Sequence, residues 1–298
     1  MVPPYLKAGD TIAIVATARH VDETIILPAI KTFETWGLKV VLSDSIYEKH
    51  DALAGSDVNR AKSFQKFLDD DSIKAIIGAR GGYGTIRMID ILDFANFNKY
   101  PKWICGFSDL TVLHSHILNN FNIPTIHSCM PVTLNQDINS DNSLKDVLFG
   151  SEINYSFHTH PLNRVENCKG IIIGGNLSVL YSLLGSKSEI DWSDKILFIE
   201  DIGEYFYHID RMMQTLKRTG KLKKIKALVV GGMTKMNDND APFAFNKSCE
   251  EIIIETVSEY QYPVFFNFPS GHQTQNLALK LGFEAQISAQ EERILFRQ

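Results

Sequence analysis

Short apolar runs alternate with amphipathic stretches through the first half of the chain. Residues 11–16 (TIAIVA) form a near-continuous apolar run of the kind found in buried strands. Residues 22–36 have helical periodicity and are followed by Gly37, a residue type that commonly ends helices. The same criteria predict strands at 39–42, 73–78, 103–106 and 125–127, and helices at 56–68, 83–92 and 109–120. The alternation predicts an α/β fold in which helices cover both faces of a parallel sheet.

A segment rich in Asn, Asp and Ser interrupts this alternation after residue 134. We therefore predict an N-terminal domain at 1–135, a linker at 136–167 and a C-terminal domain at 168–298. The C-terminal domain is predicted to contain strands at 170–174, 195–199, 227–231 and 263–266, and helices at 176–184, 207–219 and 245–258. Residues 284–297 alternate polar and apolar side chains, as an edge or barrel strand does.

The composition is that of a folded, mildly acidic protein. A chain of 298 residues is long enough for one large or two ordinary domains. Because 44% of the residues are hydrophobic and 22% are charged, the chain can form a core, and disorder of the whole chain is excluded. Lys and Arg total 30 against 35 Asp and Glu, a net charge of −5. This charge repels phosphate backbones, so we expect no nucleic-acid partner.

The cysteines and the N-terminus bear on the cellular compartment. The four cysteines include no Cys-x-x-Cys pair. A long chain with so few cysteines is typical of a reducing compartment. The first apolar run follows Asp10 and two prolines instead of the basic region of a signal peptide. No run approaches the roughly 18 apolar residues that a membrane span requires. We expect a cytoplasmic protein that does not associate with membranes.

A serine lies at a predicted strand-to-helix junction, in Gly106-Phe107-Ser108-Asp109. A serine on such a turn is exposed for reaction, and the free N–H groups that begin the next helix can stabilise an oxyanion. Leu110 replaces the last glycine of the Gly-x-Ser-x-Gly elbow, which disfavours an ordinary α/β-hydrolase. The alternative interpretation is a helix cap formed by Ser108 or Asp109.

Residues 78–84 (GARGGYG) form a glycine-rich loop after a predicted strand. Glycines let the backbone approach a ligand closely and present N–H groups to it. The spacing lacks the third glycine of the dinucleotide-binding motif, where Arg87 stands, and Gly220-Lys221 is followed by Leu222, which excludes a Walker A motif. The loop is either a cradle for an oxyanion or a carboxylate, or simply a tight turn. We expect no cofactor.

Two further side chains follow predicted strands of the second half. Glu200 comes directly after residues 195–199, and His272 lies in Pro-Ser-Gly-His, a few residues after 263–266. An imidazole can serve as a general base for a serine, and a carboxylate can orient the ring and stabilise its charged form. The alternatives are a solvated acidic loop and a structural histidine.

The remaining candidates favour structural roles. Four histidines occur in pairs one residue apart, at His114 and His116 and at His158 and His160. No third ligand accompanies either pair, so we predict no metal site. Cys129, two residues from His127, is more typical of a buried thiol than of a nucleophile. Six basic residues among 217–226 follow a helix end, where they complement the helix dipole.

Taken in order, these motifs resemble the LD-carboxypeptidase family of serine peptidases, which includes the microcin-immunity peptidases. The resemblance covers nearly the whole chain and rests on residues 6–13 (LKAGDTIA), 78–84 (GARGGYG), 106–111 (GFSDLT), 174–178 (GGNLS), 199–204 (IEDIGE), 207–211 (YHIDR) and 271–272 (GH). The chain departs from the family at Thr17-Ala18, where Pro-Ser is common, and at 127–129, where His-Ser-Cys replaces His-Gly-Pro. Neither change affects a catalytic position, but both concern the shape of the substrate pocket.

The resemblance implies an N-terminal flavodoxin-like parallel-sheet domain and a smaller C-terminal α/β domain of the swivelling β/α type. Ser108 matches the family's nucleophile, Glu200 its orienting carboxylate and His272 its general base. Because these residues lie in both predicted domains, the site is expected between them. The family uses no metal or cofactor, often forms homodimers, and acts in cytosolic peptidoglycan recycling.

The backbone amides of Asp109 and of Gly81 or Gly82 match the family's oxyanion hole, and we nominate Arg80 to bind a substrate carboxylate. We predict a serine carboxypeptidase that releases terminal D-Ala from murein tetrapeptide, cleaving the amide after meso-diaminopimelate or L-Lys. One alternative is a microcin-immunity-type peptidase that cleaves a peptidyl-nucleotide antibiotic. The other is a non-catalytic module that binds a ligand with the glycine-rich loop.

Overall fold

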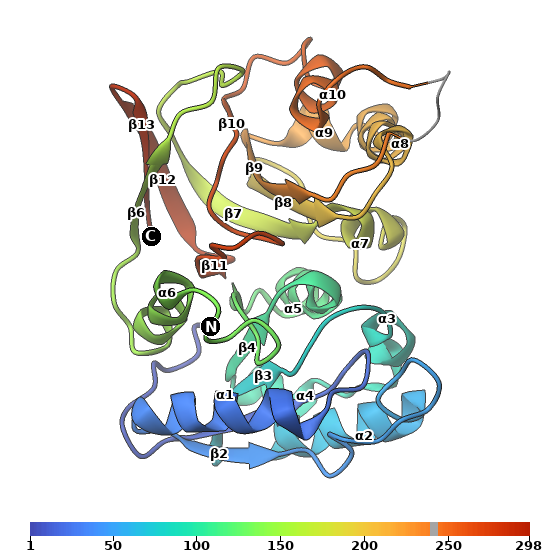
Figure 1. Ribbon diagram of the computed structural model, residues 1–298, viewed down its shortest axis with the longest axis vertical. Coiled ribbons are helices and arrows are strands. Elements are labelled where there is room, and N and C mark those ends of the chain that lie inside the picture. The colour runs from blue at the N-terminus through green and yellow to red at the C-terminus, as the bar shows by residue number, and fades with distance from the viewer. Residues whose placement is uncertain (239–243) are drawn as a thin grey trace.

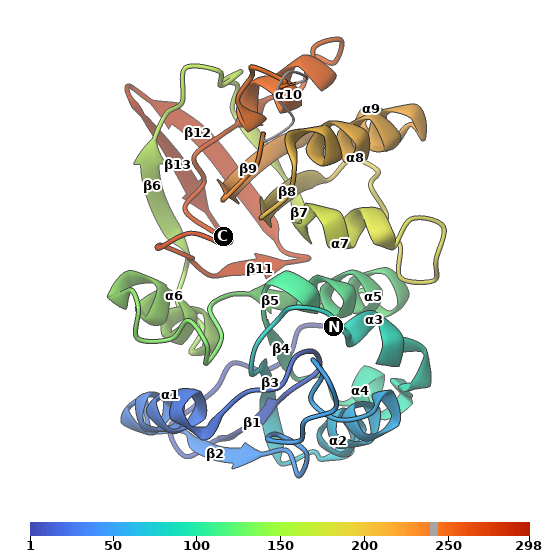
Figure 2. The ribbon, with the colours of Figure 1, turned by 45° about the vertical axis from the view of Figure 1, so that its right-hand side comes forward.

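The computed structural model describes residues 1–238 and 244–298, which form two stacked α/β domains (Figure 1). In Figures 1 and 2 the N-terminal part of the chain, blue to green, lies below the C-terminal part, yellow to red. One domain contains a largely parallel sheet and the other a mixed sheet. The predicted fold class is therefore confirmed.

The N-terminal sheet has six strands in the order β11-β5-β4-β3-β1-β2. Its five parallel strands are β1 (Thr11–Val15), β2 (Lys39–Leu42), β3 (Ile73–Gly78), β4 (Trp103–Gly106) and β5 (Thr125–His127). The order β2-β1-β3-β4-β5 is flavodoxin-like, and the direction of the strand order reverses between β1 and β3. Ligands of such sheets bind beyond the carboxyl ends of the strands near this reversal.

Helices cover both faces of this sheet, which is why most positions of its strands are apolar. Alternate residues of β1 belong to different cores, with Ile12 and Ile14 in one and Ala13 and Val15 in the other. The first core is covered by α1 (Glu23–Thr35) and α6 (Ile138–Leu148), and the second by α2 (Asp57–Asp69) and α5 (Thr111–Phe121). Between β3 and β4 lie α3 (Thr85–Met88), a 3₁₀ turn (Ile89–Ile91) and α4 (Ala95–Lys99).

The C-terminal sheet has seven strands in the order β10-β9-β8-β7-β12-β13-β6. Four are parallel, β7 (Cys168–Asn176), β8 (Ile196–Ile202), β9 (Ala227–Thr234) and β10 (Val264–Phe265), and three are antiparallel, β12 (Glu284–Gln290), β13 (Arg293–Arg297) and β6 (Asn154–His158). One face packs against α7 (Leu177–Ser182), α8 (Phe206–Arg218), α9 (Lys221–Lys224) and α10 (Cys249–Thr256). Apolar residues of the other face join the core beneath α1 and α6, so one hydrophobic core spans both domains.

Some elements differ from those that the sequence predicts. Residues 136–167, predicted as a linker, include α6, whose first turn is capped by Asp137, and the sheet strand β6. The tail at 284–297 is a hairpin, β12 and β13, both inside the sheet, instead of one edge or barrel strand. β11 (Leu279–Leu281) leaves the C-terminal domain and pairs with β5, which closes the edge of the N-terminal sheet. Among the described residues, no helix has the length and apolar character needed to cross a membrane.

Candidate active site

Ser108 lies on a sharp turn between β4 and α5. Its φ is +62°, in the left-handed region that non-glycine residues rarely adopt. Gly106, the last residue of β4, has a φ of +147°, and a Cβ there would lie 2.5 Å from a methyl carbon of Leu110. The turn therefore requires glycine at 106 and holds Ser108 in a strained conformation, as nucleophile-bearing turns do. In the described part of the chain, the Ser108 side chain caps neither the 3₁₀ turn that begins with it (Ser108–Leu110) nor α5.

The glycine-rich loop after β3 packs directly against this turn. A Cβ on Gly81 would lie 2.7 Å from the Ser108 Cβ and 3.4 Å from the Asp109 backbone nitrogen. The Asp109 side chain points elsewhere and accepts a hydrogen bond from the Thr85 N–H of α3 at 2.8 Å. Burial raises the pKa of the Asp109 carboxyl above its ordinary value, although the Thr85 hydrogen bonds oppose the change. The Asp109 carboxylate thus holds the loop, and its backbone nitrogen lies beside Ser108 and Gly81.

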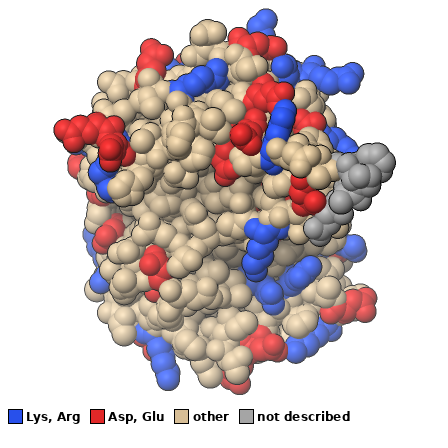
Figure 3. Space-filling model, turned by 45° about the horizontal axis from the view of Figure 1, so that its top comes forward, with Lys and Arg blue, Asp and Glu red and all other residues tan. Residues whose placement is uncertain are grey.

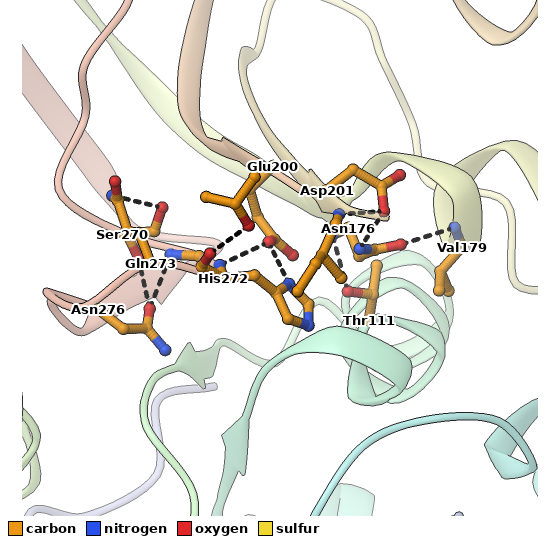
Figure 4. Close-up of polar contacts among 12 residues, drawn as sticks. Thr111, Asn176, Val179, Glu200, Asp201, Ser270, His272, Gln273 and Asn276 are labelled. Carbon is orange, nitrogen blue, oxygen red and sulfur yellow. Dashed lines mark hydrogen bonds and ion pairs between the residues drawn. The ribbon is translucent and has the colours of Figure 1, made fainter. Parts of the chain in front are cut away.

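Glu200 and His272 form a hydrogen-bonded pair at the carboxyl ends of the C-terminal strands (Figure 4). Glu200 lies within β8, and its side chain is fully buried. Its Oε2 accepts hydrogen bonds from the His272 backbone N–H at 3.0 Å and from the His272 ring Nδ1 at 2.6 Å. An ionised carboxylate only accepts, so Nδ1 carries the proton and Nε2 is the basic nitrogen of the neutral ring.

Gly271 allows this close approach. Its φ is +104°, and a Cβ there would lie 2.6 Å from the Cβ of Glu200. The Gly271 N–H donates to Asn276 Oδ1 at 2.8 Å, and Ser270 Oγ donates to the same oxygen at 3.1 Å. The loop that carries His272 is therefore fixed by its own backbone against Asn276 and Glu200.

The charges of the pair reinforce each other. Burial alone would lower the pKa of His272, but the charge and the hydrogen bond of Glu200 outweigh it, and the pKa is raised above the ordinary 6.5. Burial alone would raise the pKa of Glu200, but the charge and hydrogen bonds of His272 outweigh it, and the pKa is lowered. The pair therefore favours an ionised carboxylate beside an imidazole that readily accepts a proton.

Ser108 and His272 line one cavity of about 370 Å³ between the domains. The His272 ring also packs on Phe107, the residue before Ser108, with ring centroids 4.7 Å apart. In the part of the chain that the structure describes, no hydrogen bond joins the Ser108 hydroxyl to the His272 ring, although both side chains border the same space. The structure thus brings together the serine, the imidazole and the carboxylate from distant parts of the sequence.

Cationic side chains surround this cavity. The cavity is lined by Arg19 and Arg80, together with Gly81 and Gly82. None of the described residues that line it is acidic. Figure 3 shows a hollow across the middle of one face with Lys and Arg side chains beside it. A second cavity of about 340 Å³ adjoins the first at His272 and includes Lys235. In a protein of net charge −5, these cations make the cleft attractive to anionic ligands.

Sequence reasoning found Arg80 but missed Arg19 and Lys235. Arg19 follows the carboxyl end of β1, and Arg80 follows that of β3. These are the two strands between which the order reverses, where ligands bind in such sheets. The position of Arg19 after a predicted strand was therefore a usable signal. Lys235 follows β9 in a stretch with no distinctive motif, so its place in the cleft depends on the tertiary structure.

Several motifs of the resemblance join the two domains. The Thr111 hydroxyl of α5 accepts from the Asn176 N–H at 3.0 Å, and a Cβ on Gly175 would lie 2.5 Å from that hydroxyl oxygen. Asn176 Nδ2 donates to Asp201 Oδ1 at 2.9 Å, and the Ser178 N–H donates to Asp201 Oδ2 at 2.8 Å. Burial and the neighbouring Glu200 charge raise the pKa of Asp201 to about 6. This network, shown in Figure 4, places β8 against α5.

The other sequence candidates have structural surroundings. His114 is buried and its Nε2 contacts the Gly106 carbonyl oxygen at 2.9 Å, while the ring of His116 contacts the Ser188 hydroxyl at 2.9 Å. Cys129 is buried, and burial raises the pKa of its thiol well above the usual range. Within residues 1–238 and 244–298, no cluster of three or more His, Cys, Asp and Glu side chains could hold a metal ion.

Comparison with known proteins gives the family. Residues 12–128 match the LD-carboxypeptidase N-terminal domain, and residues 169–287 match the LD-carboxypeptidase C-terminal domain. The probable murein peptide carboxypeptidase of Bacillus subtilis is 34% identical over 97% of this chain and 92% of its own. The murein tetrapeptide carboxypeptidase of Pseudomonas aeruginosa is 25% identical over 91% of both chains.

Solved structures agree in fold. The muramoyltetrapeptide carboxypeptidase of Oxalobacter formigenes superimposes with a TM-score of 0.85 at 28% identity, covering 96% of this chain and 98% of that one. The microcin C7 self immunity protein MccF superimposes with a TM-score of 0.88 at 20% identity, covering 100% of this chain and 98% of that one, which shows a shared fold. The two domain matches and the full-length relatives establish that this chain belongs to the LD-carboxypeptidase family and is a carboxypeptidase.

Proposed function

We propose that the protein is a serine LD-carboxypeptidase that releases terminal D-Ala from murein tetrapeptide. The observation that carries the proposal is the Glu200–His272 pair at 2.6 Å, whose ring borders the same cavity as Ser108. The murein peptide carboxypeptidases among its relatives support the substrate class. The bond cleaved is the amide between the L-centre of diaminopimelate or lysine and D-Ala.

In the proposed mechanism, the Ser108 Oγ attacks the carbonyl carbon of this amide while its proton passes to His272 Nε2. The hydroxyl is a weak nucleophile at neutral pH and requires this base. Glu200 holds the ring in the tautomer that leaves Nε2 free and stabilises the imidazolium. His272 then gives the proton to the leaving nitrogen of D-Ala. The resulting acyl-enzyme is hydrolysed by a water molecule that the same imidazole deprotonates.

The tetrahedral oxyanion is proposed to bind backbone N–H groups of Asp109 and of Gly81 or Gly82. The contact of Gly81 with Ser108 and Asp109 supports this arrangement. A side chain at Gly81 would overlap the Ser108 hydroxyl, because its Cβ would lie 2.8 Å from the Oγ. Loss of one donor from such a site costs roughly 3 kcal/mol of transition-state stabilisation.

Arg80 and Arg19 are proposed to bind the free carboxylate of the terminal residue. Both line the cavity that contains Ser108, and the Arg80 guanidinium donates to the His20 carbonyl oxygen at 3.3 Å, which holds it against the segment that follows β1. Guanidinium groups bind carboxylates through paired hydrogen bonds. We expect Arg80→Met to raise KM for tetrapeptide and to have little effect on a substrate whose C-terminus is amidated. Arg218→Met, an exposed change on α8, serves as the control.

The test is incubation with L-Ala-γ-D-Glu-meso-diaminopimelate-D-Ala and its L-Lys counterpart, with D-Ala measured as product. Wild type should release D-Ala, and Ser108→Ala should be slower by about a million-fold, the order expected when a catalytic serine is removed. Ser115→Ala, a buried serine of α5 bonded to Ser188, is the matched control. Equal release by wild type and Ser108→Ala would exclude the proposal. Cleavage of a peptidyl-nucleotide with no D-Ala release would favour the microcin-immunity activity.

A further inference from the structure

Behind the Glu200–His272 pair lies a group of buried polar atoms without partners. His272 occupies only Oε2 of Glu200, and Oε1 has no hydrogen-bond partner within the described residues. In the same described part of the chain, both ring nitrogens of His127 and Nδ2 of Asn276 also lack a partner at hydrogen-bond distance, although the Asn276 side chain lies close enough to His127 to raise its pKa. Glu200 and His127 are 0% exposed and Asn276 is 4% exposed. Buried polar atoms without partners are rare because each costs about 1–3 kcal/mol.

These atoms belong to one neighbourhood. The His127 ring packs near both Phe107 and Phe198, with centroid distances of 5.9 and 5.1 Å, and Phe107 is also the ring on which His272 packs. Phe198 precedes Glu200 by two residues on β8, so their side chains lie on the same face of the sheet. The charge of Glu200 acts on the titration of His127, which is consistent with this proximity.

The orientation of Asn276 follows from its contacts. The Gly271 backbone N–H can only donate, and it donates to the side-chain oxygen of Asn276. The other end of the amide is therefore the NH₂ group, a donor. In Figure 4 this nitrogen points away from the two hydrogen bonds that the oxygen accepts. Asn276 thus links the backbone of the His272 loop to the unpartnered group.

We propose that His127 is a positioning residue of the reaction: together with Asn276 it holds the second oxygen of Glu200 through one buried water molecule. A buried water typically makes about three hydrogen bonds to polar groups that otherwise lack partners. Here Glu200 Oε1 accepts, Asn276 Nδ2 donates and a His127 ring nitrogen completes the set. The bridge prevents the carboxylate from rotating and so fixes the direction of its hydrogen bond to Nδ1 of His272.

The protonation state of His127 suits this role. Burial lowers its pKa to about 4, so the ring is neutral at physiological pH and does not compete with His272 for the negative charge of Glu200. A neutral hydrogen bond to Oε1 withdraws charge from Oε2. Its loss should concentrate charge on Oε2 and raise the pKa of His272. The other ionisable groups near these residues are Asp201 beside Glu200, His114 near His127, and the Cys129 thiol of the second cavity. Arg19, Arg80 and Lys235 lie across the two cavities.

This proposal rests on the proposed function, and its test includes a measurement that does not. His127→Phe keeps an aromatic ring and removes both nitrogens, whereas His127→Gln keeps a donor and an acceptor. His116→Gln is the control, since His116 is a buried histidine of α5 that lies outside both cavities. Each variant is examined by thermal unfolding, by the pH profile of kcat/KM for tetrapeptide, and by NMR titration of His272 in the Ser108→Ala background.

We expect His127→Phe to lower kcat about ten- to a hundredfold, the order that a misplaced catalytic group costs. It should also move the acid limb of the profile and the NMR titration of His272 to higher pH. His127→Gln should restore most of both, and His116→Gln should change neither. If His127→Phe does not fold, His127→Val takes its place. A folded variant with unchanged kcat and unchanged His272 titration would overturn the proposal, as would a His127→Gln variant as slow as His127→Phe with no shift in titration.

The two proposals fail in different ways. If Ser108→Ala releases D-Ala as fast as wild type, the proposed function is wrong, whatever His127 does. The NMR titration requires no substrate, so an upward shift of the His272 pKa in His127→Phe would still support the hydrogen-bonded bridge. Conversely, fast D-Ala release by both wild type and folded His127→Phe, with unchanged titration, would contradict only the role of His127.

Discussion

Gly271 offers a sharp test of how closely the Glu200–His272 pair must be held. In Gly271→Ala the new Cβ would lie 2.6 Å from Glu200 Cβ, 2.7 Å from its Cγ and 2.8 Å from its Oε2. Because non-bonded carbon atoms approach to about 3.5 Å, the carboxylate or the loop would have to move by about 1 Å. The backbone adds a cost, since a φ of +104° strains any residue with a side chain.

A displacement of about 1 Å of a catalytic group costs about a hundredfold in rate, which corresponds to about 2.7 kcal/mol of activation free energy. We therefore expect Gly271→Ala to lower kcat for D-Ala release about a hundredfold. The backbone strain should also lower the free energy of unfolding by about 1–2 kcal/mol. Both are measurable on the same preparation, by coupled D-amino acid detection and by urea unfolding.

Gly220→Ala is the matched control. Gly220 also has a left-handed φ, +73°, but nothing lies within 4 Å of where its Cβ would be. It should show a comparable loss of stability with normal kcat, which separates backbone strain from displacement of the pair. A Gly271→Ala protein that is folded and retains at least half of the wild-type kcat would refute the reasoning.

Three further predictions follow from the same structure. Activity requires neutral His272, and its raised pKa places the acid limb of kcat/KM above pH 6.5, to be read from a pH–rate profile; a limb below 6.5 would contradict the Glu200 pairing. Burial lowers the pKa of His114 to about 3, so it stays neutral when folded, whereas the unfolded chain takes up its proton as pH falls below about 6.5. The stability that neutral His114 contributes is complete above pH 6.5 and falls by about 1.4 kcal/mol per pH unit as the pH is lowered towards 3. The free energy of unfolding, measured with urea at several pH values, should therefore depend less steeply on pH in His114→Gln, by about 1.4 kcal/mol per pH unit. Thr111→Val leaves the Asn176 N–H without its acceptor and should lower the free energy of unfolding by about 1–3 kcal/mol, as measured by urea unfolding. Thr219→Val is the control, because the Thr219 hydroxyl donates to two backbone carbonyls of its own helix, those of Thr215 and Leu216.

The sequence alone predicted most elements of the N-terminal sheet, because a strand covered on both faces is apolar at nearly every position. β1, with Ile12 and Ala13 in different cores, is such a strand. The turn at Ser108 and the loop at Gly81 were also recognisable, because both require glycine where the backbone makes close contacts. The order of the motifs further indicated the family.

Only the tertiary structure showed how these pieces meet. α6 was hidden because its Ser, Asn and Asp residues have low helix propensity, and it is held by the buried Leu144 and Val147 and by the Asp137 cap. β11 pairs with a strand about 150 residues earlier in the chain, a contact that local patterns do not encode. The packing of the two sheets likewise determines three features of the site. These are the Glu200–His272 distance, the positions of Arg19 and Lys235 in the cleft, and the unpartnered nitrogens of His127. Hydrophobic periodicity specifies which face of an element is buried, whereas the partner it is buried against is decided by the packing of the whole chain.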